Sequence, residues 1–324
     1  MLKAYDFIYD EKKLSEFGMI LCNFGGSKGV ETVSDGCNIT FNTISTQNGY
    51  KHESTSAQYE ECLETTWQIC KYSCSGGIQP ITATEHRNLT RWLNRKSFLK
   101  LKPLSDEYID LYCEASFNIS RIEVDGILYG LELEVKTNRP FFLKEPVTIT
   151  VQTKKLYTWE KYDKNDDGSK GESTGEYVTS YDEEAYPENG VKLYFVDDFG
   201  NNIESEHYYV YKKAENVASI FDASHEEGYI YPHTEITILE DGDLTIYNAL
   251  EDRETDIANC ETDEVITMDY PVIKTTSDTH KIQNDFNWNF FRVANTYENR
   301  RNDLTTSVPC RIKIEYSPIV KVGL

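Results

Sequence analysis

Apolar and polar residues alternate at every second position in several segments of this chain. The clearest segment is 310–316, where Cys310, Ile312, Ile314 and Tyr316 alternate with charged residues. A period of two predicts a strand with one buried face and one face in water. Segments of this kind recur along the chain, which favours a fold built mostly from strands.

Two more strand-like runs, 235–239 and 244–247, flank the dipeptide Asp241-Gly242. Asp-Gly between apolar runs is a strong signal for a tight turn, so the sequence predicts a β-hairpin here. Many short strands at this spacing are typical of β-sandwiches. We therefore expect a mostly β protein.

One segment has a helical pattern. Thr82-Ala83-Thr84-Glu85 matches a capping box, in which the first and last side chains satisfy free backbone amides. Three apolar residues then fall on one face: Leu89, Trp92 and Leu93. The pattern predicts a helix near 83–95 whose apolar face packs on the core. A weaker helical pattern covers 56–70.

A second face of the predicted helix carries Arg87, Arg91 and Arg95. The stretch from Arg87 to Lys102 has six basic residues and no acidic one, in a chain with net charge −22. Arginine forms planar, bidentate contacts with carboxylates. These three arginines are therefore candidates for an oligomer interface, and a solvated face that offsets nearby acids is the alternative.

The length of 324 residues suggests two domains. Residues 1–150 carry a net charge of −4 and residues 151–324 a net charge of −18, which points to two regions with different surroundings. We expect an N-terminal domain at 1–148 and a second domain at 149–324. The segment 157–187 has few aliphatic residues, so we expect a long exposed loop or extended hairpin, an arm inserted into the second domain.

The charge balance excludes some functions. Nucleic-acid binders need lysine and arginine in excess to neutralise phosphates, and an anionic membrane surface repels a chain of this charge. We therefore expect no direct contact with nucleic acid or membrane. The eight cysteines are too sparse for a disulfide scaffold, and no signal peptide precedes them, so we expect reduced thiols in a cytosol.

No catalytic, cofactor or metal site stands out. Gly25-Gly26-Ser27-Lys28-Gly29 fits the pattern of a nucleophile elbow, but the residues after it do not predict the helix that such an elbow requires. Asp163-Lys164-Asn165-Asp166-Asp167-Gly168 matches half of a calcium loop, with Thr174 where a bidentate glutamate belongs. We favour a solvated acidic loop over calcium binding and expect no enzyme.

An ordered series of motifs within 81–141 resembles the first domain of siphophage distal tail proteins, the Dit family. The series is Arg91-Trp92-Leu93, Leu101-Lys102-Pro103, Tyr112 to Ile119, Glu123-Val124-Asp125-Gly126, Gly130 to Val135 and Thr137-Asn138-Arg139-Pro140-Phe141. The resemblance implies an N-terminal β-sandwich with a helix, followed by a galectin-like β-sandwich.

The same resemblance implies a structural role without catalysis or cofactor. Distal tail proteins form hexameric rings that join the tail tube to the tail-tip hub protein and to receptor-binding proteins. The expected location is the tail tip of a virion that is assembled in the host cytoplasm. The alternative is a carbohydrate-binding β-sandwich module, similar to an adhesin. The galectin sugar signature is absent around Trp159 and Trp288, so the fold alone does not imply sugar binding.

Overall fold

The computed structural model describes residues 4–25, 37–46, 51–73, 76–106, 109–183, 185, 194–196, 202–204, 207–296 and 298–321. The chain forms two compact units. Unit 1 comprises residues 1–146 with the short returning segments 224–226 and 317–324, and unit 2 comprises 147–223 and 227–316. The sequence predicted a single division after residue 148. It did not predict that the segments 224–226 and 317–324 pack with unit 1.

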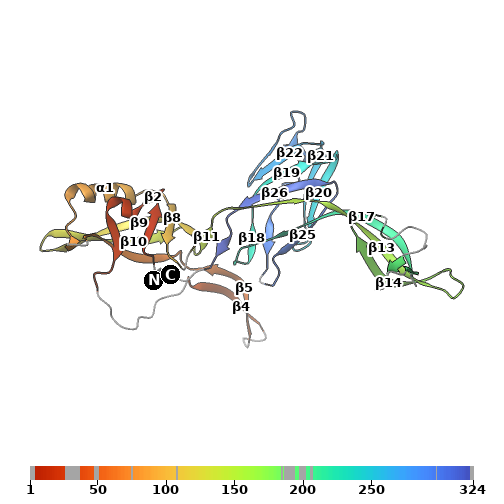
Figure 1. Cartoon of the computed structure of the whole chain (residues 1–324), viewed down its shortest axis with the longest axis horizontal. Helices are drawn as coiled ribbons and strands as arrows, with labels where there is room; N and C mark the ends of the chain where they lie inside the picture. Colours follow the sequence, from red (N-terminus) through yellow and green to blue (C-terminus); the bar gives the residue numbers. More distant parts are fainter. Residues whose placement is uncertain are drawn as a thin grey trace. The chain divides into compact units, whose positions relative to one another are not determined.

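Unit 1 is one ten-stranded sheet with a helix packed on it (Figure 1). Its central strands follow the order β2-β1-β8-β9-β10-β6-β3. They are β1 (Asp6–Tyr9), β2 (Lys12–Lys13), β3 (Met19–Cys22), β6 (Glu64–Ser73), β8 (Leu99–Leu104), β9 (Leu111–Val124) and β10 (Ile127–Thr137). Shorter strands extend the sheet: β7 (Gly77–Gln79), β11 (Phe142–Lys144) and β27 (Ile319–Val320).

The hairpin of β9 and β10 closes through Asp125-Gly126, and both residues have positive φ, 51° and 79°. This is the conformation that a two-residue turn between twisted strands requires, and it explains the Asp-Gly pair. A separate hairpin of β4 (Ile39–Thr46) and β5 (Lys51–Tyr59) pairs with no other strand among the described residues.

The predicted helix is present as α1 (Ala83–Leu93), and its N-terminus has the capping box between Thr82 and Glu85. Leu89, Trp92 and Leu93 are buried in the core of unit 1, as predicted. The Trp92 ring stacks on Phe17, with centroids 4.3 Å apart. Its indole N–H donates a 2.8 Å hydrogen bond to the backbone carbonyl of Tyr9. The helix is thereby tied to the strand β1 and to the short 3₁₀ helix η1 (Leu14–Phe17).

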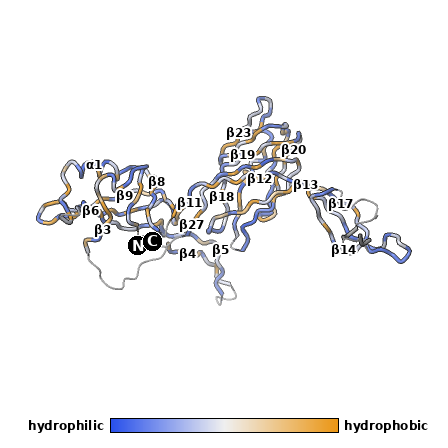
Figure 2. The backbone as a smooth tube through the Cα atoms, in the orientation of Figure 1, coloured by the Kyte–Doolittle hydropathy of each residue, from blue (hydrophilic) through white to orange (hydrophobic). Residues whose placement is uncertain are grey.

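Unit 2 is a sandwich of two sheets around one apolar core, to which both sheets contribute buried apolar residues. Figure 2 shows hydrophobic and hydrophilic positions alternating along its strands. The five-stranded sheet consists of β12 (Val147–Gln152), β26 (Cys310–Tyr316), β19 (His233–Ile238), β22 (Val265–Asp269) and β23 (Val272–Thr275). The six-stranded sheet consists of β14 (Lys170–Ser180), β13 (Lys154–Lys164), β17 (His207–Phe221), β25 (Arg301–Thr306), β20 (Gly242–Asn248) and β21 (Arg253–Cys260).

Two short strand pairs and a short helix complete unit 2. They are β15 (Tyr194–Val196) with β16 (Asn202–Glu204), β18 (Gly228–Ile230) with β24 (Val293–Asn295), and α2 (Ile282–Asp285). The strand predicted at 310–316 is β26, with Cys310, Ile312, Ile314 and Tyr316 all buried. The prediction of a mostly β fold is confirmed.

Two local predictions are wrong. The runs around Asp241-Gly242 form no hairpin, because β19 and β20 belong to different sheets of the sandwich. The turn carries the chain from one sheet to the other, and Asp241 accepts hydrogen bonds from Thr262. The weaker helical pattern at 56–70 falls on β5 and β6.

The segment 157–187 adopts the second of its two predicted forms, an extended hairpin. β13 pairs with β14 from Tyr157 to Lys164, and β17 pairs with the other side of β13 from His207 to Val217. β17 pairs with β25 only from Asn216 onward. Before Asn216, the six-stranded sheet therefore continues as three strands, β14, β13 and β17. We call this three-stranded extension the arm. Residues 184 and 186–190 lie outside the described part.

The first prediction concerns Trp92. Trp92→Ala removes the stacking on Phe7 and Phe17 and the bond to Tyr9, so it should lower the free energy of unfolding by about 3–5 kcal/mol. Arg91→Ala, one residue away and exposed, should change it by less than about 0.5 kcal/mol. Thermal and urea unfolding of both variants measure this. Equal stability of the two variants would contradict the packing role of Trp92.

Candidate assembly surfaces

The N-terminus of α1 is held by a charge-assisted network. The Glu85 carboxylate accepts a 2.8 Å bond from the Thr82 amide, and the Glu85 amide donates to the Thr82 hydroxyl at 3.3 Å. Lys71, on β6, lies 2.6 Å from the same carboxylate. The Lys71 ammonium and then the Thr82 amide hold the pKa of Glu85 down at about 2. The helix is therefore fixed on the sheet at both ends, by this network and by Trp92.

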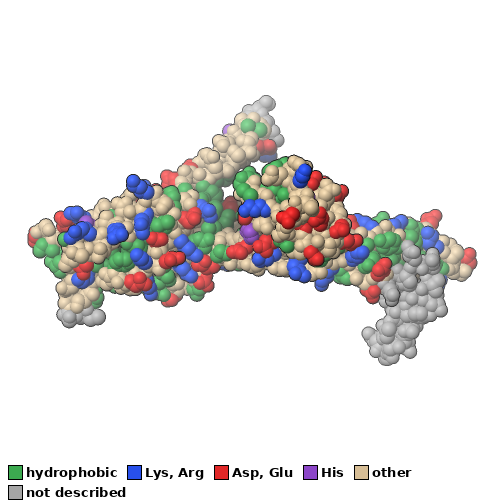
Figure 3. Space-filling view, turned by 90° about the horizontal axis from the view of Figure 1, so that it is seen from above, with side chains coloured by type: hydrophobic (Ala, Val, Ile, Leu, Met, Phe, Trp, Pro, Cys, Tyr) green, Lys and Arg blue, Asp and Glu red, His purple; other side chains and the backbone are tan. Residues whose placement is uncertain are grey.

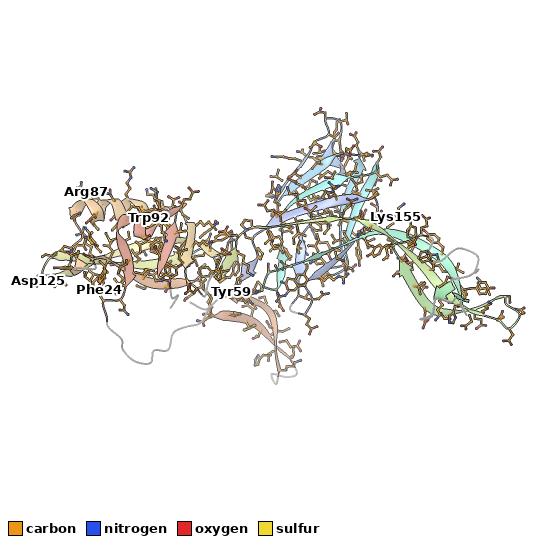
Figure 4. All side chains as sticks on the ribbon, viewed as in Figure 1. Phe24, Tyr59, Arg87, Trp92, Asp125 and Lys155 are labelled. Atoms are coloured by element: carbon orange, nitrogen blue, oxygen red, sulfur yellow. The ribbon has the colours of Figure 1, made fainter. Side chains whose placement is uncertain are left out.

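The three candidate interface arginines are all exposed; Arg87 and Arg91 lie on α1, and Arg95 lies just after the helix, which ends at Leu93. Figure 4 shows Arg87 on the outer side of α1 and Trp92 on the side that faces the sheet. Arg87 bonds to the carbonyl of Ala83 on its own helix. Arg95 forms an ion pair with Asp10, with nitrogen and oxygen 2.9 Å apart, and donates to the carbonyl of Trp92. Arg95 is thus engaged within the chain, and the role of the three arginines at an interface stays a prediction.

The hairpin of β4 and β5 is a surface that the sequence did not reveal. Ile39 and Phe41 lie on one face of β4, opposite Tyr59 and Ala57 of β5. Phe41 is 57% exposed, and Ile39 and Ile44 are also exposed. Residues 39–46 contain no charged residue. In the space-filling view of Figure 3, most of the hairpin is tan or green, the colours of backbone and uncharged side chains. Isolated two-stranded hairpins are marginally stable in water.

The base of this hairpin is anchored to the rest of unit 1. The Tyr59 hydroxyl donates a 2.6 Å bond to Glu226, and Lys321 pairs with the same carboxylate at 2.8 Å. Burial and the neighbouring Glu226 raise the pKa of Tyr59. The hairpin is therefore fixed at one end and exposed over most of its length.

A second exposed apolar area lies on the strand ends of unit 1. Val124 and Ile127 are paired across the tip of the β9–β10 hairpin, which Figure 4 marks by Asp125. Tyr72 and Ile78 are paired across β6 and β7, and both are exposed. These cross-strand pairs leave apolar side chains in water at the edges of the sheet.

The arm of unit 2 has its own packed interior, and one of its edges pairs with no further strand among the described residues. Trp159 is fully buried, and Glu160 accepts bonds from Tyr162, Ser173 and Lys212. The Lys212 ammonium, first, and the two hydroxyls lower the pKa of Glu160 to about 2. β14 is the edge strand of its sheet. An open edge presents backbone groups that a partner strand can pair with.

The other sequence candidates are only partly within the described residues. In the turn between β13 and β14, Asn165 and Asp167 bond to Ser169, and no group of three potential metal ligands occurs in the described ranges. Residues 26–30 of the glycine loop lie outside the described residues. Seven cysteines are free, and Cys74 falls in the undescribed part. No described helix is long and apolar enough to cross a membrane.

Comparisons with known proteins complete this description. A family model described as a phage tail protein N-terminal domain matches residues 2–139, and one described as a phage tail C-terminal domain matches residues 199–316. Together they cover more than three quarters of the chain, and the β13–β14 hairpin lies between them. No curated protein matches the sequence significantly.

Among solved structures, the SPP1 Dit protein has the same fold. The superposition covers 97% of this chain and 99% of that protein, with a TM-score of 0.52 and 8% sequence identity. That protein is described as a paradigm of the hub adsorption apparatus in phages that infect Gram-positive bacteria. The resemblance to distal tail proteins found in the sequence is confirmed.

The second prediction concerns the pH dependence of the α1 cap. Because the pKa of folded Glu85 is lowered to about 2 from 4.5, its stabilisation is complete above pH 4.5 and is lost as the pH falls toward 2. Glu85→Gln should therefore lower the free energy of unfolding by about 1 kcal/mol at pH 7 and by much less at pH 2.5. Thermal unfolding at both pH values, with the exposed Glu11→Gln as control, measures this. A difference that stays constant across this pH range would contradict the assignment.

Proposed function

This chain belongs to the phage tail protein family that these two domains describe, and we propose that it is a distal tail protein that forms a hexameric ring. The ring joins the tail tube protein to the tail-tip hub protein and to receptor-binding proteins. Its place is the tail tip of the virion, after assembly in the host cytoplasm. Two findings support the proposal. The N-terminal and C-terminal domains of a phage tail protein match the chain in that order, and its fold matches SPP1 Dit over 97% of its length.

A ring of identical subunits needs one heterologous contact, repeated until it closes. Copies of this chain repel one another because each has a net charge of −22. The contact must therefore use surfaces that are low in charge or that carry the opposite charge. Among the described residues, unit 1 has surfaces of both kinds, and we choose the β4–β5 hairpin and the arginines of α1 from them.

We assign the apolar face of the β4–β5 hairpin to the contact with the next copy. Ile39 and Phe41 are exposed there, and the strand that carries them has no charge. Burying a phenylalanine side chain contributes about 1.5–3 kcal/mol, and the ring repeats this gain at every contact. The fixed base at Tyr59 limits the conformational freedom that binding removes.

The second part of the contact is Arg87 and Arg91, which meet carboxylates of the neighbour. Exposed ion pairs contribute less than about 1 kcal/mol each, so their effect is on orientation and on the choice of partner. Arg95 is a weaker candidate because it already pairs with Asp10. No catalytic role is assigned to the chain, since its family is one of structural tail proteins.

We assign the contact with receptor-binding proteins to the arm. The β13–β14 hairpin lies outside both matched family domains, and β14 pairs only with β13 in the part of the chain that the structure describes. Tyr177 on β14 is exposed. Edge pairing supplies backbone hydrogen bonds, and exposed tyrosines supply contact area at a small loss of conformational entropy.

The third prediction tests the hairpin. Phe41→Asp should leave the melting temperature of the subunit unchanged, because Phe41 is exposed, and should weaken ring assembly by about 10- to 100-fold. Phe221→Asp, an exposed phenylalanine of unit 2, should assemble like the unmodified chain. Sedimentation velocity over a concentration series measures both. Unchanged rings from the Phe41 variant would exclude this hairpin from the contact.

The fourth prediction tests the arginines. Arg87→Glu combined with Arg91→Glu reverses two charges in each repeated contact and should weaken assembly, with a larger effect at low salt. Arg87→Gln with Arg91→Gln, which keeps much of the side-chain length, should have a smaller effect. The same sedimentation series at 50 and 500 mM salt reads the outcome. Full assembly of the Glu variant at low salt would place these residues outside the ring contact.

A further inference from the structure

Six aromatic side chains of unit 2 are joined in one series of ring contacts. In order of contact, they are Tyr229, Tyr231, Tyr270, Phe290, Trp288 and Phe286, with neighbouring ring centroids 4.3 to 6.4 Å apart. Phe286 and Phe290 are buried in the core, whereas Tyr229, Tyr270 and Trp288 are each more than half exposed. We call this series the aromatic surface. Its buried rings hold its exposed rings in place.

The loop that carries Trp288 is tied to the neighbouring strand β21. The Asn287 amide donates to the carbonyl of Asp256 at 3.1 Å, and the Asn287 side chain donates to the Asp256 carboxylate at 2.7 Å. Phe286 forms a bridge with Ile257. Trp288 itself has a φ of 61°, a left-handed conformation that is uncommon for a bulky residue. The chain thus keeps an unfavourable backbone conformation where it exposes a large apolar side chain, and this combination indicates a contact surface.

An acidic hollow of about 550 Å³ adjoins the aromatic surface. Its walls come from the end of β20, the start of β21 and the loop that follows α2. Arg292 connects the two features, because it lines the hollow and its guanidinium lies 3.8 Å from the ring centre of Tyr229. The charged residues of the lining are Glu251, Asp252, Glu254, Asp256, Arg253 and Arg292. Four carboxylates and two guanidinium groups give the lining a net charge of −2.

One of these carboxylates is free to pair with a cation. Arg292 pairs with Glu251 at 2.7 Å, and the Tyr247 hydroxyl donates to Asp252 at 3.1 Å. Asp256 is engaged by the loop that carries Trp288. The exposed carboxylate of Glu254 makes no hydrogen bond or ion pair among the described residues. The hollow therefore presents an unpaired negative charge beside exposed aromatic rings.

This charge decides which occupant the surface fits. A second copy of the chain is repelled, because residues 151–324 carry a net charge of −18. An anionic lipid surface is repelled for the same reason. Arginine suits the surface best, since its planar guanidinium both stacks on aromatic rings and pairs with carboxylates. A hollow of this volume admits a few side chains but no folded domain.

We propose that the aromatic surface and the hollow together bind an extended, basic segment of a partner protein. Apolar side chains of the segment, proline among them, cover Tyr270 and Trp288, as extended proline-containing segments do on other aromatic surfaces. An arginine of the segment enters the hollow and pairs with Glu254. Tyrosine, tryptophan and arginine are the residues that most often carry the binding energy of protein interfaces. The surface goes beyond the proposed ring and does not depend on it, since all its residues lie in unit 2.

The test is binding of a synthetic peptide to the full chain. The peptide has about ten residues, with leucine and proline in its first half and arginine and proline in its second. Calorimetry and fluorescence anisotropy at 50 mM salt should give a dissociation constant on the order of 10–100 μM, as for other short segments that dock on preformed surfaces. A matched peptide with citrulline in place of arginine keeps the shape without the charge, and it should bind at least about tenfold more weakly.

Variants of the chain separate the two parts of the surface. Trp288→Ala should weaken peptide binding at least about tenfold. Glu254→Gln should weaken it about 3- to 10-fold at 50 mM salt and by less at 500 mM, because salt screens an exposed charge pair. Tyr5→Ala, which removes an exposed aromatic ring of unit 1, should bind like the unmodified chain. Melting temperatures of all three variants, measured in parallel, should stay close to that of the unmodified chain.

Four results would overturn the proposal. They are no binding of the peptide at millimolar concentration, equal binding of the citrulline peptide, equal binding by the folded Trp288 variant, and salt-independent binding that Glu254→Gln leaves unchanged. Vesicles of neutral phosphatidylcholine are tested in parallel. Binding of the chain to these vesicles without binding of the peptide would identify a membrane as the occupant and would also overturn the proposal.

Discussion

Electrostatic repulsion between copies is the constraint on which the other features depend. A chain with 55 acidic and 33 basic residues can associate with itself only where charge is absent or complementary. Unit 1 carries both kinds of surface, and residues 151–324 carry most of the excess negative charge. The division of charge thus matches a division of roles, with assembly assigned to unit 1 and outward contacts to unit 2.

The packing of Trp92 gives these surfaces a fixed geometry. The indole ring of Trp92 lies against Phe7 and Phe17, and its N–H donates to the carbonyl of Tyr9. These contacts hold α1 in one orientation on the sheet. With the apolar face held down, Arg87 and Arg91 are directed outward by the helix period alone. The buried aromatic residue thus leaves Arg87 and Arg91 exposed, as the proposed contact with a neighbouring copy requires.

Local patterns predicted what local forces determine. The capping box, the buried face of α1 and the alternation in β26 follow from hydrogen bonding and burial within a few residues, and all are present. The Asp241-Gly242 turn shows the limit, because the same dipeptide closes a hairpin or connects two sheets, and long-range packing decides which. The β4–β5 hairpin and the hollow at the start of β21 were not predicted, for the same reason. Exposure of an apolar residue, and residues brought together from β21 and the loop after α2, are properties of the folded chain.

The most direct test of the account is the mass and symmetry of the purified full-length chain. Mass photometry and negative-stain microscopy at physiological salt should show closed sixfold rings with six times the 37.4 kDa of one chain. Because repulsion opposes assembly, the fraction in rings should rise as salt screens the acidic surfaces. A monomer that persists at high salt and at tens of micromolar protein, or a closed dimer, would contradict the central claim.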